Sequence, residues 1–321
     1  RFVPDDLGEG IRWDNRLNWD TDDLPGLYSQ DSVDLGGNNV VYGQTSTIDT
    51  LDLSGGTLDV YAGRLTATGG IQGEGGTLNI SDTGQAWLAG SDGSALDINV
   101  SGGRFANTGN MSGADLTATG GQTILATGGA EYDLDAGQTL SVDSSSAKVG
   151  FDSNDGGLAI LDMHAGATLA FSAQDGDFGD ISEFRSGAFG DTPNVSSGID
   201  LGDATLDIDL TGLSASAGTA FTLMSADELI GLFGNATVNG LGARDANIVI
   251  DYQNDTVTLQ LSAGNGAVSV STVGSESDIS TGDDAIWNAL TAGQGVVSNS
   301  QLATASATTD PLLDDPTLFA A

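Results

Sequence analysis

Short phrases of alternating apolar and polar residues recur along this chain, and this repetition limits its possible folds more than any other feature. Gly55-Gly-Thr-Leu-Asp-Val60 and Gly75-Gly-Thr-Leu-Asn-Ile80 begin 20 residues apart. Leu-Thr-Ala-Thr-Gly-Gly occurs at 65–70 and again at 116–121. Similar runs cover 48–53, 95–100, 132–134, 139–142, 158–161 and 168–171.

Each run alternates over four to six positions, which is typical of a β-strand with one buried face. Gly, Asn, Asp and Ser separate the runs and permit sharp turns. A unit of about 20 residues with two or three strands has the size of one turn of a β-solenoid, in which each turn covers its neighbour's apolar face. We therefore predict an all-β fold, a right-handed parallel β-helix. A β-sandwich, which also has closely spaced short strands, is the alternative.

The pattern changes at both ends of the repeats. Residues 1–47 contain Trp13 and Trp19 and are predicted to form an N-terminal cap over the open edge of residues 48–171, the β-helix itself. An acidic, Gly-rich loop is expected at 172–198, pinned to the solenoid by Phe178, Phe184 and Phe189 or presenting them as a contact patch. We expect a closing β segment at 199–274 with one helical turn at 226–230, then a short helix and extended tail at 275–321.

The formal charge of -37 arises from 45 acidic and 8 basic residues, and 39 of the acids are Asp. Asp favours turns and caps, so the composition agrees with a turn-rich β protein. So few basic residues argue against nucleic acid as a partner, and no run is long and apolar enough to insert in a membrane. The absence of Cys and the solubility that acidity gives in salt favour an extracellular or cell-surface protein. Because the chain starts at Arg1, we expect a removed leader or a longer precursor.

Two stretches resemble bacterial autotransporter passengers and related secreted β-helix surface proteins. The first holds Trp13, Asn18-Trp19 and Pro25-Gly26, and it is similar to the Trp-rich segment that precedes the rungs of such proteins. The second, 199–261, is similar to their closing β segment. The resemblance implies a surface location and an adhesive or structural role. It does not extend to the translocator, because no alternating membrane strands follow residue 262.

The residues required for catalysis are sparse. His164 is the only histidine, and Asp162 lies two residues away, but we expect a surface histidine here. One Lys and seven Arg are few for a polysaccharide lyase, and the acidic surface would repel uronate substrates. Carboxylate pairs for glycoside hydrolysis are too numerous to single one out. Gly282-Asp-Asp284 is similar to part of a pectinase motif, and we interpret it as a helix cap.

Calcium is the better site hypothesis, because hard cations prefer several carboxylate and amide oxygens together. Two acidic loops offer such oxygens, although neither has the spacing of an EF-hand, and solvated turns are the alternative. The candidate ligands are Asp152, Asn154, Asp155, Asp175, Asp177 and Asp180.

We therefore expect a non-enzymatic extracellular structural or adhesive protein that self-associates or binds a cell-surface glycan or protein. Ca²⁺ bridging into a layer or fibre is part of this expectation. The alternative is a glycan-binding or glycan-cleaving β-helix, such as a phage tailspike or a secreted polysaccharide hydrolase. A virion component that serves as a stiff spacer is the third possibility.

Overall fold

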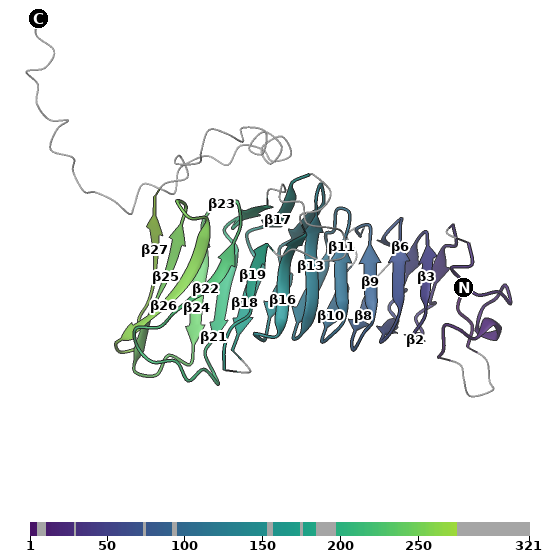
Figure 1. The fold of residues 1–321 in the computed structure, drawn as a ribbon, viewed down its shortest axis with the longest axis horizontal. Helices are drawn as coiled ribbons and strands as arrows, with labels where there is room; N and C mark the ends of the chain where they lie inside the picture. Colours follow the sequence, from purple (N-terminus) through teal and green to yellow (C-terminus); the bar gives the residue numbers. More distant parts are fainter. Residues whose placement is uncertain are drawn as a thin grey trace, which may run out of the picture. The chain divides into compact units, whose positions relative to one another are not determined.

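In the computed structural model the regular structure of the described residues is β, apart from one short 3-10 helix, η1 (Arg16–Asn18). The structure describes residues 1–4, 11–28, 30–72, 75–91, 95–152, 157–173, 176–183 and 197–274. These residues belong to one compact unit, Arg1–Ile279, in which parallel strands follow one another in two long sheets (Figure 1).

The first long sheet has nine strands, all in parallel pairs. Its strands are, in order, β2 (Asn39–Tyr42), β5 (Thr57–Val60), β8 (Gly76–Ile80), β10 (Leu96–Val100), β12 (Ala114–Ala118), β15 (Thr139–Val142), β18 (Thr168–Ser172), β21 (Thr205–Asp209) and β24 (Asn235–Asn239).

The second long sheet has eleven strands, parallel from β3 to β22 and mixed beyond β22. Its strands are β3 (Thr45–Ile48), β6 (Arg64–Ala67), β9 (Gln85–Leu88), β11 (Arg104–Asn107), β13 (Gly121–Thr127), β16 (Ala147–Asp152), β19 (Asp180–Glu183), β22 (Ala220–Ser225), β26 (Thr256–Ala263), β25 (Arg244–Asp251) and β27 (Val268–Val273).

Two shorter sheets complete the set, and both are parallel. One contains β1 (Val33–Asp34), β4 (Leu51–Asp52) and β7 (Ile71–Gln72), and the other contains β14 (Glu131–Leu134), β17 (Ala159–Met163), β20 (Ser197–Asp200) and β23 (Glu228–Ile230).

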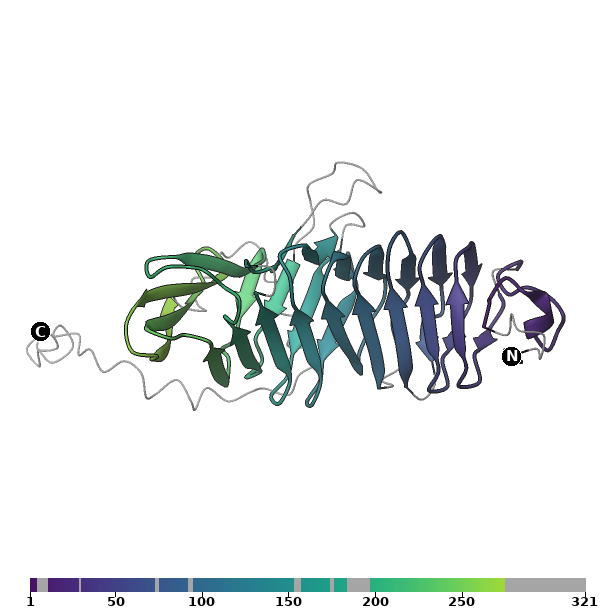
Figure 2. The same cartoon turned by 90° about the horizontal axis from the view of Figure 1, so that it is seen from below.

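The chain visits the sheets in a repeating order, and Figure 2 shows the resulting succession of strands. A strand of the nine-stranded sheet is followed by one of the eleven-stranded sheet and, in most turns, by one of a short sheet. Thr57 pairs with Thr77, as the repeat of 20 residues predicts, whereas Thr168 pairs with Thr205 because longer connections intervene. Long parallel sheets in an all-β chain are thus confirmed.

The alternation within each run places one apolar row inside the stack. In the nine-stranded sheet Leu58, Leu78, Ile98, Leu116 and Leu140 are register partners on successive strands, and all are fully buried. Each such side chain contributes about 1.5–3 kcal/mol through removal from water. This continuous apolar interior stabilises the stack. The described residues contain no disulfide that would add to it.

Glycine at the corners allows the turns to stack closely. Gly63 has φ of +67°, and a Cβ there would lie 1.9 Å from the carbonyl oxygen of Gln44 in the preceding turn. A side chain at this corner would therefore clash with backbone, so the spacing of successive turns depends on the absence of one.

The N-terminal segment lies on the first strand of the nine-stranded sheet. The N–H of Trp13 donates to the Val41 carbonyl at 3.0 Å, and the Val41 N–H donates to the Ile11 carbonyl at 2.6 Å. The Trp13 ring contacts Trp19 and Tyr42, each with 5.0 Å between ring centroids. These contacts cover the backbone edge of β2 and the end of the apolar interior.

Two details differ from the sequence-based expectations. The helical turn expected at 226–230 is wrong, because β23 pairs with β20 there and extended backbone gains partners that one helical turn would lack. The loop expected at 172–198 includes β19, while Phe184 and Phe189 lie outside the described residues. The repeated phrase at 65–70 and 116–121 lies in different sheets, in β6 and in β12. The helix and tail expected at 275–321 also lie outside the described residues.

Candidate functional site

The four-stranded sheet brings together two carboxylates and the imidazole. Asp133 in β14 and Asp162 in β17 are register partners, so their side chains project from neighbouring positions on one face. His164 follows β17, and its N–H donates to the Leu134 carbonyl at 3.0 Å, which fixes it beside the end of β14. Parallel pairing of two strands thus assembles a group of three titratable side chains.

The geometry of this group suits a single cation. One potential ligand atom from each of Asp133, Asp162 and His164 lies within 4.8 Å of the others. His164 Nε2 is 3.9 Å from Asp162 Oδ2, and these side chains are 32% and 8% exposed. Because metal–ligand bonds to nitrogen and oxygen are about 2.0–2.6 Å long, one ion has room to reach all three with small side-chain movements.

The charges around Asp133 are unfavourable without a cation. Burial is the largest cause that raises the pKa of Asp133 to about 7; the negative charges of Glu131, Asp162 and Asp135 contribute to this rise, and His164 opposes it. A proton is therefore partly retained on Asp133 near neutral pH. A bound cation would replace that proton and neutralise the same repulsion.

The donor types indicate which ions fit. An imidazole with two carboxylates suits Zn²⁺, Mn²⁺ or a related divalent transition metal better than Ca²⁺, which prefers oxygen ligands. Within the described part of the chain this is the one group of three or more His, Cys, Asp or Glu residues that meets the distance criterion.

A second group of acids lies near the start of β20 and β23. Burial raises the pKa of Glu183, a hydrogen bond from Ser197 opposes the shift, and the charge of Asp227 adds to it. Burial also raises the pKa of Asp255, whose Oδ1 accepts from the Leu229 N–H at 3.1 Å. This group consists of carboxylates with local hydrogen-bond donors, and we assign no ligand to it.

The calcium ligands expected from sequence are separated where the structure describes them. Asp152 ends β16 and is 1% exposed, and its Oδ2 lies 3.3 Å from Arg104 Nη2. Asp180 is exposed at the other end of the paired strand, opposite Lys148. Four residues of extended chain, about 13 Å, separate the two positions. Asp177 Oδ1 accepts from the Phe178 N–H at 2.9 Å. Asn154, Asp155 and Asp175 lie outside the described residues, and the calcium hypothesis stays a prediction.

Phe178 is buried rather than part of a contact patch. Its side chain is 8% exposed, and its ring centroid lies 5.2 Å from that of Phe221 in β22. This contact fastens the segment before β19 to the sheet, which is the pinning role that the sequence offered as one of two readings.

Sequence reasoning found His164 and Asp162 but missed Asp133, the residue that completes the group. Asp133 lies in β14, one turn before β17, and no local pattern connects the two strands. A signal was present, because Tyr132-Asp-Leu134 and Leu161-Asp-Met163 are both an Asp between two buried apolar residues. Aligning these two triplets would have placed Asp133 beside Asp162.

The described residues contain no helix long and apolar enough to cross a membrane. Comparison of the chain with protein-family models, with curated proteins and with solved structures gave no match.

Proposed function

We propose that this chain is a non-enzymatic extracellular protein with a structural or adhesive role, built on a right-handed parallel β-helix. The observation that carries the proposal is the continuous parallel stack from β2 to β24, which offers long, regular outer faces. Such a stack is stiff, because each strand is hydrogen-bonded on both sides and each turn covers the apolar face of the next.

The right-handed path rests on a general rule. Parallel strands of one sheet joined by a crossover have a right-handed connection in about 98% of cases, because the strands themselves twist to the right. The repeating order of strands through the sheets makes every turn such a crossover. An experimental map at a resolution that fixes the hand tests this point, and a left-handed path would overturn it.

The titratable groups are consistent with such a role. The imidazole of His164 has Asp162 and Asp133 as its neighbours, a set that can hold an ion or a proton. The charge of -37 and the lack of Cys favour an exported protein in a saline medium, where salt screens the repulsion between carboxylates.

Two measurements test the proposal. Surface labelling and fractionation of the source cells should find the protein outside the cytoplasm, and a purely cytoplasmic protein would overturn the extracellular role. A panel of neutral and acidic glycans incubated with the full chain should show no new reducing ends, because release of fragments would instead establish the glycan-cleaving alternative.

Self-association and calcium are tested together. We expect sedimentation velocity in millimolar CaCl₂ to show larger species that return to the starting size in excess EDTA. Identical sedimentation in both conditions, at low and at high salt, would remove calcium bridging from the proposal and leave the rest intact.

A further inference from the structure

Three of the eight basic residues lie in one row on the eleven-stranded sheet. Register pairing places Arg64 beside Gln85, Gln85 beside Arg104, Arg104 beside Gln122 and Gln122 beside Lys148. We call these five residues the basic row. They come from the successive strands β6, β9, β11, β13 and β16, and their side chains alternate between cation and amide.

Trp87 holds two of the cations in place. The guanidinium carbon of Arg64 lies 5.1 Å from the centroid of the Trp87 ring, and that of Arg104 lies 5.3 Å from it. The two arginines come from β6 and β11, the strands that pair with β9 on either side. Cation–π contacts of this kind lower the number of conformations that each arginine samples.

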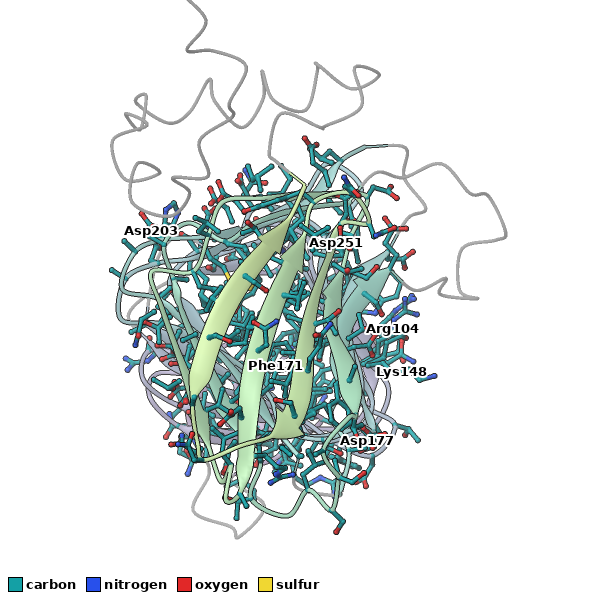
Figure 3. All side chains as sticks on the ribbon, turned by 90° about the vertical axis from the view of Figure 1, so that its left-hand side faces the viewer. Arg104, Lys148, Phe171, Asp177, Asp203 and Asp251 are labelled. Carbon is teal, nitrogen blue, oxygen red and sulfur yellow. The ribbon has the colours of Figure 1, made fainter. Side chains whose placement is uncertain are left out.

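The surroundings leave the row with positive charge to offer. Strands β3, β6, β9, β11 and β13 contain no Asp or Glu. Arg104 is paired with Asp152, but among the described residues neither Arg64 nor Lys148 forms an ion pair, and both are exposed. Asp180 of β19 is the register partner of Lys148, so the charge at this end of the row is partly offset. Figure 3 looks along the stack and shows Arg104 and Lys148 on the same flank, away from Asp203.

The spacing of the row is regular. Neighbouring strands lie about 4.8 Å apart, so cations on every second strand recur at about 10 Å and the row spans about 19 Å. The amides of Gln85 and Gln122 lie between them and supply both donors and acceptors. A linear ligand with negative groups at wide intervals and hydroxyl groups between them matches this order.

We propose that the basic row binds a linear acidic polysaccharide, with Arg64, Arg104 and Lys148 facing its carboxylate or sulfate groups. The repulsion of uronates expected from the sequence comes from the net charge, whereas the strands of the eleven-stranded sheet from β3 to β13 contain no acid and present a locally basic face. This inference rests on the proposed adhesive function and names the ligand class. The two glutamines bind hydroxyl groups of the intervening sugars, and Trp87 positions the guanidinium groups.

Other partners fit the row less well. Proteins bind single-stranded nucleic acids by stacking the bases on aromatic side chains. Here the guanidinium groups of Arg64 and Arg104 already contact the Trp87 ring. A second copy of the chain would need a larger and more apolar surface, because a stable protein interface buries about 800 Å² on each partner with an apolar centre. The row is a narrow polar strip without such a centre.

The test uses the full chain and three immobilised probes: polygalacturonate, dextran sulfate and neutral dextran. We expect binding to at least one charged probe at 50 mM NaCl, weaker binding at 300 mM NaCl and none to neutral dextran. Binding to polygalacturonate or to dextran sulfate distinguishes carboxylate from sulfate as the recognised group. No binding to either charged probe overturns the inference.

The decisive variant is Arg64→Gln with Lys148→Gln, which removes the two unpaired cations and leaves the Arg104–Asp152 pair. We expect binding at least about tenfold weaker than wild type. Arg12→Gln with Arg16→Gln removes the same charge near the N-terminus and should bind like wild type. Equal loss in both double variants, with unchanged thermal melting, shows a non-specific charge effect and overturns the site.

Two further measurements separate this inference from its alternatives. Tighter binding of duplex DNA than of either acidic glycan, or concentration-dependent association that the decisive variant abolishes, would overturn the glycan assignment. Surface display of the Arg64→Gln, Lys148→Gln variant in source cells should persist. If the wild-type protein is displayed on the cell surface but binds no acidic glycan, the inference fails and the proposed function stands.

Discussion

The outward faces of the two long sheets use the same strand period but carry opposite charges. From β2 to β24 the nine-stranded sheet holds Asp59, Asp97, Asp115, Asp207 and Asp209 at its outward positions and contains no Lys or Arg. The eleven-stranded sheet contains no acid from β3 to β13, and it carries the basic row. Charge is therefore segregated between the two sheets as far as β13, beyond which β16 and β19 of the eleven-stranded sheet contain Asp152, Asp180 and Glu183.

The two faces also stabilise their neighbouring turns differently. On the nine-stranded sheet, Asn99 Nδ2 donates to Asn79 Oδ1 at 3.0 Å, and Asn79 Nδ2 donates to Asp59 Oδ1 at 2.6 Å. On the eleven-stranded sheet the corresponding lateral contacts are the arginine–Trp87 pairs. Burial fixes the inward rows as apolar, so the outward rows are free to differ between faces.

The largest expected effect concerns Arg104, the middle residue of the basic row. Arg104→Gln removes the cation beside Asp152, whose side chain is 1% exposed, and we expect a loss of about 3 kcal/mol in the free energy of unfolding. Arg64→Gln, at an exposed position on the same row, should cost less than about 1 kcal/mol. Urea denaturation of both variants measures the difference. Equal losses would show that the row is uniform and serves no separate structural role at Arg104.

The next effect compares two pairs of adjacent carboxylates. Asp97 and Asp115 are register partners whose side chains are exposed to solvent, whereas Asp133 and Asp162 are register partners beside the imidazole of His164. At 100 times its dissociation constant, Zn²⁺ bound to the second pair would stabilise the fold by about 2.7 kcal/mol. We expect Zn²⁺ to raise the Tm of the wild type and of Asp97→Asn, but not of His164→Ala. A rise retained in His164→Ala would place the ion elsewhere.

A smaller effect tests the amide ladder of the acidic face. Asn79→Ala removes both the bond to Asp59 and the bond from Asn99, and we expect a loss of about 1–2 kcal/mol in the free energy of unfolding. Gln85→Ala, at a half-buried position on the opposite sheet, should change it by about 0.5 kcal/mol or less. Chemical denaturation decides, and similar values for both would mean that the ladder adds no stability.

The last comparison is a pH dependence, measured in EDTA so that no metal competes. The pKa of Asp133 is raised from 3.8 to about 7 in the folded chain, so folding favours its protonated form. Its contribution is most favourable below about pH 4 and is lost as the pH rises toward 7. Asp133→Asn should flatten the decline in Tm over this range, and Asp97→Asn should not. An unchanged decline in Asp133→Asn would assign it to other carboxylates.

The strands and turns were largely predictable from local sequence. Alternation in Gly-Gly-Thr-Leu-Asp-Val and Gly-Gly-Thr-Leu-Asn-Ile predicts β5 and β8. The spacing of 20 residues between the two phrases, the length of one turn, predicts that Leu58 and Leu78 are neighbours. The prediction of a helical turn at 226–230 was wrong, because it is the pairing of β23 with β20 that makes this segment extended. Local preference was overridden there by hydrogen bonds from a distant strand.

By itself the sequence determined which residues form strands, which side of each strand is buried and where the chain turns. Those properties depend on alternation, on glycine and on turn residues within a few positions. Only the tertiary structure decided which strands share a sheet. Leu-Thr-Ala-Thr-Gly-Gly serves the eleven-stranded sheet at 65–70 and the nine-stranded sheet at 116–121.

For the same reason, neither the basic row nor the Asp133–Asp162 pair could be predicted from local sequence. The connections between turns differ in length, so Gln85 is followed in its row by Arg104, but Gln122 is followed by Lys148. A fixed repeat cannot align residues across such connections. Parallel register aligns them, because backbone hydrogen bonds hold every strand directly beside its counterpart in the next turn.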